Sequence, residues 1–239
     1  MTKPRKLAVG IGTAAAVCGV LASLLPTSVA WIFAWASLSC GLAAWAYVAN
    51  RPGIYGKRRG RLVWWRAAPT AIFLGAFRIA CALMRTWRGH PTTSRVSTSV
   101  WVAGRIEAAD LPAGLDFVVD LVSEFPEPAD VRSRPGYRFL AVLDGGVPPA
   151  IDPVLELLEE LADPQRPALV HCDSGMGRAP TFAALLMLRR GEADTVDEAR
   201  AAIERARPFV HLGTVDRAFL AHVAPRVPRP NLPHTAAAS

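Results

Sequence analysis

The sequence predicts an α/β fold with a small central sheet flanked by helices, preceded by a transmembrane helical hairpin. Two uncharged runs near the N-terminus are long enough to cross a bilayer. After residue 95, apolar runs of strand length alternate with longer helical patterns, which is typical of α/β layer folds. The distribution of charged residues changes in the same region of the sequence. Residues 1–90 hold 12 of the 27 Lys and Arg and no acid, so the net charge of +7 is +12 there and −5 in the remainder, which has 15 basic and 20 acidic residues.

The predicted hairpin consists of residues 7–25 and 28–49, separated by Pro26 and Thr27. Each run can span a hydrocarbon layer of about 30 Å as a helix. Lys and Arg flank both outer ends, so the positive-inside rule places both ends in the cytoplasm. A cleaved signal peptide is the alternative for the first run, but the second run follows at once. Because the positive charge belongs to this apolar part, we attribute it to anionic lipid and exclude nucleic acid as a partner.

Residues 62–84 are also apolar, but Arg66, Pro69 and Arg78 interrupt them. A central Arg costs about 2.5 kcal/mol or more in a spanning helix, so we expect a helix lying in the membrane interface. A third span is the alternative, and it would place the rest of the chain outside the cytoplasm. The predicted parts are a hairpin with basic flanks (1–61), an interfacial helix and linker (62–94), a soluble domain (95–226) and a disordered tail (227–239).

Within the soluble domain, strands are expected at residues 100–102, 117–121, 137–143 and 168–170. A helix should begin near Asp152, which is a suitable N-cap before Pro153. Further helices are expected at 179–190, ended by Gly191, at 196–205 and at 214–222. Thr195 and Glu198 form a capping box for the helix at 196–205.

The segment 171–180, HCDSGMGRAP, carries the chemistry, because it joins a buried strand to an apolar helix. Backbone amides of a tight loop followed by a helix N-terminus form a cradle for a phosphate, and Gly175 and Gly177 permit the curvature. Arg178 can bind two phosphoryl oxygens, and the same positive field favours the thiolate of Cys172 as a nucleophile. The alternative is that Cys172 is only a small buried apolar residue.

His171-Cys172, five residues and Arg178 resemble the signature of the cysteine-dependent protein tyrosine phosphatases, and the domain is most similar to their dual-specificity branch. Residues 99–105, 118–124 and 206–212 resemble further segments of that branch. The resemblance implies a dual-specificity phosphatase-like fold, Cys172 as nucleophile and Arg178 as the phosphate-binding arginine. It implies no metal or cofactor. The phosphate-binding loop falls on Asp173, Ser174, Gly175, Met176, Gly177 and Arg178.

The general acid of this family lies on a loop after a strand, and Asp144 fits by position. Asp152 is the alternative, although its expected capping role explains it better. Asp120 and His211 are expected to be structural. We expect His171 to orient the loop by hydrogen bonding.

Two positions depart from the family. Ala179 stands where a hydroxyl usually follows the arginine, so either Thr181 replaces that hydroxyl or hydrolysis of the intermediate is slower. Asp173 stands where lipid-directed relatives often carry Lys, and its charge should repel polyanionic headgroups.

These observations predict a membrane-anchored phosphatase with a cytoplasmic catalytic domain, acting on phosphotyrosine, phosphoserine or phosphothreonine of proteins through a phosphocysteine. One alternative is a lipid phosphomonoester phosphatase, with a substrate such as a phosphatidylglycerol phosphate. Another is a catalytically weak phosphate-binding protein, suggested by Ala179. The expected partners are a phosphorylated protein or lipid and the bilayer. A thiol redox function is disfavoured because the soluble part has no second cysteine.

Overall fold

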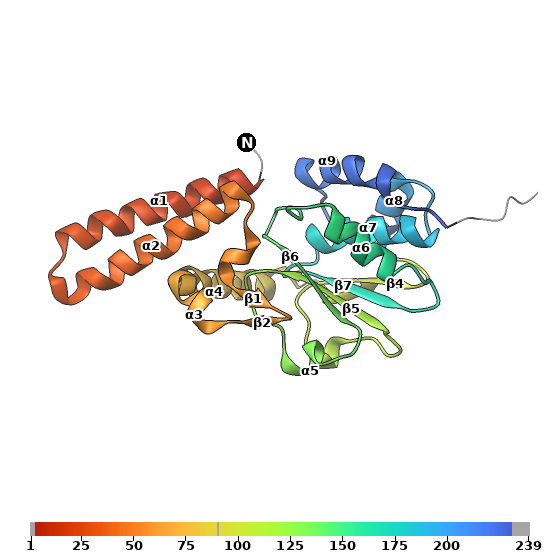
Figure 1. Cartoon of the computed structure of the whole chain (residues 1–239), viewed down its shortest axis with the longest axis horizontal. Coiled ribbons are helices and arrows are strands. Elements are labelled where there is room, and N and C mark those ends of the chain that lie inside the picture. The colour runs from red at the N-terminus through yellow and green to blue at the C-terminus, as the bar shows by residue number, and fades with distance from the viewer. Residues whose placement is uncertain (1–2, 90, 231–239) are drawn as a thin grey trace, which may run out of the picture.

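The computed structural model describes residues 3–89 and 91–230, and a helical hairpin projects from an α/β body (Figure 1). Helices α1 (Lys3–Leu24) and α2 (Thr27–Ala49) form this hairpin. Pro26 separates them, as predicted, because proline lacks the amide that a continuous helix requires. The two helices pack closely, and the Ser37 hydroxyl donates to the Ala15 carbonyl at 2.8 Å.

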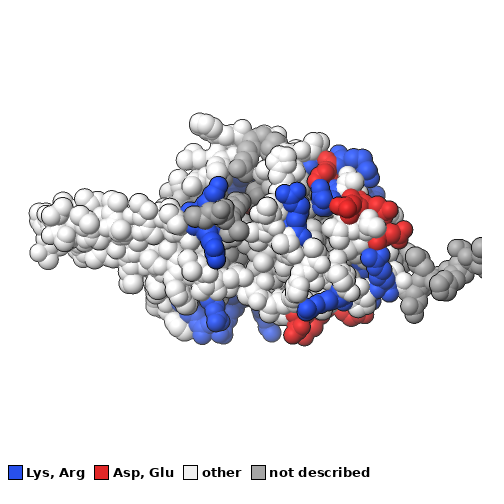
Figure 2. Space-filling model, turned by 90° about the horizontal axis from the view of Figure 1, so that it is seen from above, with Lys and Arg blue, Asp and Glu red and all other residues white. Residues whose placement is uncertain are grey.

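The projecting part of the hairpin shows no charged side chain in Figure 2, and basic side chains begin where it meets the body. Many of its large apolar side chains are exposed, among them Trp31, at 58%, and Leu38, at 56%. Among the described residues, three helices are long and apolar enough to cross a membrane: Pro4–Leu24, Thr27–Ala49 and Trp64–Trp87. The two expected spans are therefore present as helices, and the predicted interfacial segment is also a candidate span by length and composition.

The segment that follows the hairpin is folded against the body. It consists of η1 (Pro52–Tyr55), β1 (Lys57–Arg58), β2 (Arg61–Leu62), α3 (Trp64–Ala67), η2 (Ala68–Thr70) and α4 (Ala71–Arg88). The single helix expected over 62–84 is thus interrupted by a 3-10 turn at Pro69. On α4, Phe77 stacks on Phe125 with ring centroids 5.6 Å apart, and Cys81 is buried in the main core. Helix α4 is therefore part of the α/β body.

The central sheet has five strands in the order β3-β4-β7-β5-β6. The four predicted strands are present as β4 (Val100–Ala103), β5 (Phe117–Val122), β6 (Tyr137–Val142) and β7 (Ala168–His171). These four run parallel, and the unpredicted β3 (Thr93–Arg95) pairs antiparallel with β4 at the edge. The carboxyl ends of the parallel strands therefore meet at one edge of the sheet, where the loop of residues 172–177 follows β7.

Helices cover both faces of the sheet. The α6 (Asp152–Glu160), α7 (Arg178–Arg190), α8 (Val196–Ala206) and α9 (Thr214–Val223) helices lie above it in Figure 1, and α5 (Ala129–Arg132) lies below. Short turns η3 (Ala108–Asp110) and η4 (Ala224–Arg226) complete the fold. Helix α7 is buried along almost its whole length, as its apolar sequence predicts, and it ends at Gly191 with φ +69°.

The N-termini of two helices can be compared with the predicted caps. The Thr195 hydroxyl accepts the Glu198 amide at 3.1 Å, which confirms that cap. The N-cap prediction for Asp152 is wrong, because α6 already begins at this residue and no side chain caps its N-terminus. At the C-terminal end, Val227 is 5% exposed and packs in the core, so the ordered body extends past the predicted start of the tail. The rest of that predicted tail, residues 231–239, lies outside the described residues.

Candidate active site

The loop between β7 and α7 places Cys172 at the edge of the sheet. Its sulfur accepts the Gly175 amide at 3.2 Å, and the residue is 1% exposed. Gly175 has φ +68°, and a Cβ there would lie 2.7 Å from the Gly104 amide nitrogen and from Arg207 Nη2. Only glycine fits this tight turn, which directs a backbone donor at the sulfur. Such a donor stabilises a thiolate.

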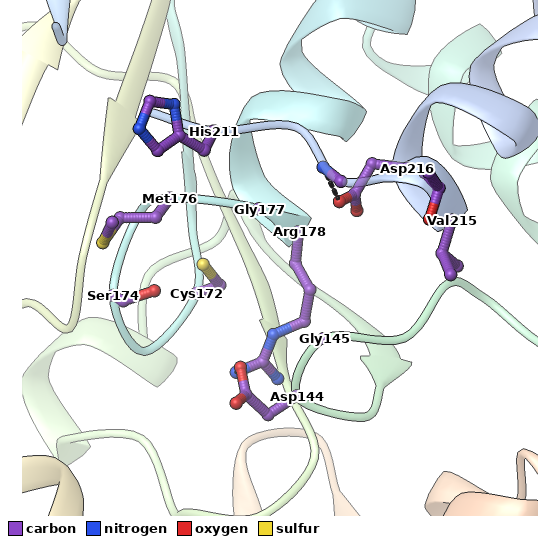
Figure 3. A pocket seen from close by; sticks show the side chains of 12 residues that line it. Asp144, Gly145, Cys172, Ser174, Met176, Gly177, Arg178, His211, Val215 and Asp216 are labelled. Carbon is purple, nitrogen blue, oxygen red and sulfur yellow. Dashed lines mark hydrogen bonds and ion pairs between the residues drawn. The ribbon is translucent and has the colours of Figure 1, made fainter. Parts of the chain in front are cut away.

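A cavity of about 260 Å³ opens above this loop (Figure 3). Of the residues predicted for the site, Asp144, Cys172, Ser174, Met176, Gly177 and Arg178 line it. The opposite wall comes from residues 211–216, at the start of α9. His211 is exposed and belongs to this wall, so it is not the core residue that a structural role would require.

Arg178 is held by groups at the ends of two strands, β5 and β6. Its Nη1 donates to the Val142 carbonyl at 2.8 Å, to Glu124 Oε2 at 3.1 Å and to the Leu121 carbonyl at 3.3 Å. Its Nη2 lies 3.3 Å from Asp144 Oδ1. Burial alone would lower the pKa of Arg178, but Glu124, Asp144 and Cys172 outweigh it and raise the pKa. The site therefore contains a permanent, fixed positive charge beside the cysteine.

Comparison with known proteins agrees with this geometry. Residues 102–215 match the family described as Swiss Army Knife protein, DSP-PTPase phosphatase domain. The segment is a dual-specificity-type phosphatase domain. No curated protein matches the chain.

The chain is also similar to solved structures. Tk-PTP in its active form is 22% identical, human DUSP28 is 19% identical, and PTPMT1 in complex with PI(5)P is 15% identical. Each alignment covers 57% of this chain, and it covers 99%, 95% and 96% of the respective structure. The TM-scores are 0.46, 0.46 and 0.49.

Asp144 lies directly after β6 in the phosphatase domain, and its side chain is 25% exposed. Its backbone amide donates to Glu124 Oε1 at 2.7 Å. Figure 3 shows the carboxyl group beside the guanidinium of Arg178. Asp152, the alternative acid, is exposed and does not line the cavity. The arrangement thus favours Asp144 as the titratable group that can meet a leaving oxygen.

Asp173 does not present a bare charge at the rim of the cavity. Its Oδ1 forms an ion pair with Arg85 Nη1 on α4 at 2.7 Å, and its side chain is 9% exposed. The expectation that Asp173 repels polyanionic headgroups is therefore wrong, because Arg85 neutralises it. The partner is 88 residues earlier in the chain, so local sequence could not reveal the pair.

The Thr181 hydroxyl does not replace the hydroxyl that Ala179 lacks. It donates to the Gly177 carbonyl at 2.9 Å, and Asp216 Oδ1 lies 3.3 Å away. Its contacts thus stabilise the junction between the loop and α9. The alternative expectation, slower hydrolysis of the intermediate, is the one that remains.

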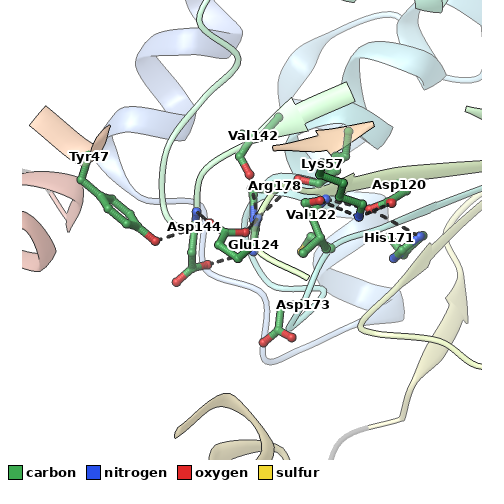
Figure 4. Close-up of polar contacts among 12 residues, drawn as sticks. Tyr47, Lys57, Asp120, Val122, Glu124, Val142, Asp144, His171, Asp173 and Arg178 are labelled. Atoms are coloured by element: carbon green, nitrogen blue, oxygen red, sulfur yellow. Dashed lines mark hydrogen bonds and ion pairs between the residues drawn. The ribbon is translucent and has the colours of Figure 1, made fainter. Parts of the chain in front are cut away.

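A buried polar cluster lies behind the loop (Figure 4). Lys57 Nζ from β1 donates to Asp120 Oδ2 at 2.5 Å. His171 Nε2 lies 3.6 Å from Glu127 Oε1. Burial lowers the pKa of His171 to about 4, and burial and Asp120 raise that of Glu127 to about 8. Hydrogen bonding with the backbone of Cys172, at the start of the loop, opposes the lowering of the His171 pKa, which agrees with the expected loop-orienting role of His171. Asp120 is a buried structural anchor, as expected.

Asp120, Glu127 and His171 place their ligand atoms within 4.8 Å of one another, which a metal ion requires. However, the Lys57 ammonium already occupies the cation position at Asp120. The donor set therefore does not fit a further dication, and we assign no metal to it.

Sequence analysis missed two functional positions. Glu124 is fully buried and pairs with Arg178, and Arg207, 1% exposed, packs under Gly175 and donates to the Val102 carbonyl at 3.1 Å. Burial lowers the pKa of Arg207, although the nearby Cys172 opposes this shift. Both lie in segments that resemble the family. The sequence signal that could have identified Glu124 is its position shortly after a predicted buried strand. An acidic residue that becomes buried there needs a charged or hydrogen-bonding partner.

Proposed function

We propose that this chain is a membrane-anchored phosphatase that hydrolyses phosphotyrosine, phosphoserine or phosphothreonine of proteins, with its catalytic domain in the cytoplasm. The observation that carries the proposal is the joint placement of Cys172 and Arg178. A sulfur that accepts a loop amide lies at one wall of a cavity, and a fixed guanidinium lies at another. Nucleophile and anion-binding group thus face one space that can hold a phosphate.

In the first step, the Cys172 thiolate attacks phosphorus, and the bond from phosphorus to the leaving oxygen breaks. Asp144 protonates that oxygen, while loop amides and Arg178 stabilise the charge of the transferring group. In the second step, the Asp144 carboxylate removes a proton from water as the water oxygen attacks phosphorus. The sulfur–phosphorus bond breaks, which releases inorganic phosphate and restores the thiolate.

A lipid phosphomonoester is the second candidate substrate, and the Arg85–Asp173 pair favours it. Neutralising Asp173 removes the charge that would oppose an anionic headgroup. The same helix exposes Ile79, Leu83 and Trp87, the last at 90%. Exposed apolar side chains next to the phosphate-binding loop suit a site that works at a lipid surface.

We further propose that α4 lies in the membrane interface and does not cross the bilayer. Phe77 and Cys81 pack into the domain core, and Arg85 pairs with the loop of the active site. A spanning α4 would have to leave these contacts. With two spans and basic residues at both outer ends, the domain faces the cytoplasm.

The test uses the full chain purified in lipid nanodiscs, with an aryl phosphate, a phosphotyrosyl peptide and a phosphatidylglycerol phosphate as substrates. Cys172→Ser should abolish turnover of all three while vanadate still binds, because the cradle is formed by backbone amides and Arg178. Activity that survives in Cys172→Ser would contradict the proposal. The ratio of peptide to lipid turnover decides between the two substrate classes.

A further inference from the structure

The C-terminal end of α2, the second helix of the hairpin, reaches the active site. Tyr47, in its last turn, is 4% exposed, and its hydroxyl donates to Glu124 Oε1 at 3.4 Å. Asn50, which follows the helix, donates from Nδ2 to the Val147 carbonyl at 3.1 Å. Figure 4 shows Tyr47 approaching Asp144 and Glu124 from the side opposite to the buried cluster around Lys57. Two side chains of the hairpin thus contact the catalytic machinery.

Glu124 divides its two oxygens between the catalytic groups. Oε2 accepts Arg178 Nη1 at 3.1 Å, and Oε1 accepts both the Asp144 amide at 2.7 Å and the Tyr47 hydroxyl. The carboxylate is fully buried, so no water competes for these positions. A displacement of Tyr47 therefore changes the hydrogen bonding of the oxygen that holds the backbone of Asp144.

Asn50 holds the same loop from its other side. Residues 143–151, between β6 and α6, form no helix or strand and carry two consecutive glycines, Gly145 and Gly146. Such a loop has few internal constraints, so its contacts set its position. Leu143, at its start, packs in one apolar cluster with Ala43 and Tyr47, and Val147, further along, accepts the Asn50 amide. The helix end therefore contacts this loop on both sides of Asp144.

We propose that Tyr47 and Asn50 are positioning residues that fix the general-acid loop, so that proton transfer from Asp144 depends on how α2 sits on the domain. This inference rests on the proposed function, with Asp144 as the acid. It assigns the hairpin a role in the reaction besides anchoring. The position of a membrane helix then affects the step in which the leaving group departs.

The experiment compares Tyr47→Phe and Asn50→Gly with the parent protein, as full chains in nanodiscs. Glycine retains the left-handed conformation of Asn50, φ 48°, and removes only the amide. Tyr55→Phe is the matched control, because Tyr55 is fully buried in the same cluster and its hydroxyl has no hydrogen-bond partner among the described residues. The readout is kcat/KM, which reports the step in which the leaving group departs, on aryl phosphates whose leaving groups range from strongly acidic phenols to phenol itself.

Loss of one hydrogen bond should lower kcat/KM for phenyl phosphate by about 3- to 10-fold in each variant, and by less than about 2-fold for the most activated ester. Vanadate affinity should change little. Tyr55→Phe should match the parent on every ester. The distinguishing result is that the deficit grows with the pKa of the leaving group, which a general loss of folded protein would not produce.

An equal deficit on all esters, or no deficit, in an active preparation would overturn this inference and leave the proposed function intact. The same deficit in Tyr55→Phe would also overturn it, since packing alone would then explain the effect. A parent protein without activity on any ester would instead contradict the proposed function, and this inference with it.

Discussion

Glu124 organises the candidate site at the scale of single residues, because one of its oxygens accepts the Asp144 amide and the other accepts Arg178 Nη1. Breaking a buried ion pair by removing one partner costs more than the pair contributes, since it leaves an uncompensated charge. If Glu124 were replaced by an uncharged residue, Arg178 would be this uncompensated buried charge. The position of the phosphate-binding arginine and that of the candidate acid are thus not independent, although 34 residues separate them in sequence.

Asp144→Ala should lower kcat/KM by about 10²–10⁴-fold for phosphate esters with poor leaving groups, because the departing oxygen then receives no proton. On an activated aryl phosphate the loss should be small. Steady-state kinetics on the two kinds of ester measures the difference. Asp152→Ala is the matched control, since this exposed carboxylate lies outside the cavity and makes no cap, and it should leave both rates unchanged. A stronger effect at Asp152 would transfer the acid role to that residue.

The buried pair of Glu127 and His171 predicts a pH dependence of stability. The pKa of Glu127 is raised to about 8, so between pH 6.5 and 8 the folded state binds a proton that the unfolded state lacks, and stability falls as pH rises. The pKa of His171 is lowered to about 4, so His171 makes stability increase as pH rises. This effect is confined to pH values below about 6.5.

Urea unfolding at pH 6.5 and pH 8 measures this effect. The free energy of unfolding should decrease by about 1–2 kcal/mol over this interval in the parent protein. Glu127→Gln should remove that decrease, because glutamine does not titrate. An unchanged pH slope in Glu127→Gln would assign the effect to another group.

At the scale of elements, α4 supports the phosphate-binding loop from outside the cavity, because Arg85 neutralises Asp173 next to the cysteine. Arg85→Ala should raise the KM for a phosphotyrosyl peptide and weaken vanadate binding by about 3- to 10-fold, since Asp173 then opposes an anion. Arg78→Ala removes the same charge from an exposed position of the same helix and serves as the control. If the two variants behave alike, overall helix charge explains the effect and the ion pair does not.

The sequence predicted those elements that depend on neighbours in the chain. Strand β7, helix α7 and the loop between them followed from an apolar run, two glycines and a stop at Gly191. The edge strand β3 was missed because three polar or charged residues carry no alternating apolar pattern. The Asp152 cap was placed wrongly because a helix boundary depends on backbone angles, which the residue type only biases.

Most of the site's electrostatics could not be predicted from the sequence. Lys57 pairs with Asp120 across 63 residues, and Arg85 pairs with Asp173 across 88. Such pairs arise only when tertiary packing brings distant segments together. The loop signature therefore predicted that Cys172 and Arg178 lie together at one cavity, but it predicted neither the partner of Asp173 nor the contacts of Thr181.

At the scale of the whole molecule, two spans predict that a reporter fused after Ser239 lies on the cytoplasmic side. A protease added to intact cells should leave the reporter uncut, and it should cut it once the membrane is permeabilised. A reporter placed between α1 and α2 is the control with the opposite expectation. Cleavage of the C-terminal reporter in intact cells would mean that α4 crosses the bilayer.

The hairpin and the body share contacts at Tyr47, Asn50 and α4, so a hairpin that spans the bilayer, as proposed, would hold the cavity at a set height above the bilayer surface. A catalyst tethered in this way meets its substrates by lateral diffusion in two dimensions. Its turnover should then follow the mole fraction of phosphorylated molecules in the membrane, and diluting a vesicle suspension with buffer should leave the rate per enzyme unchanged.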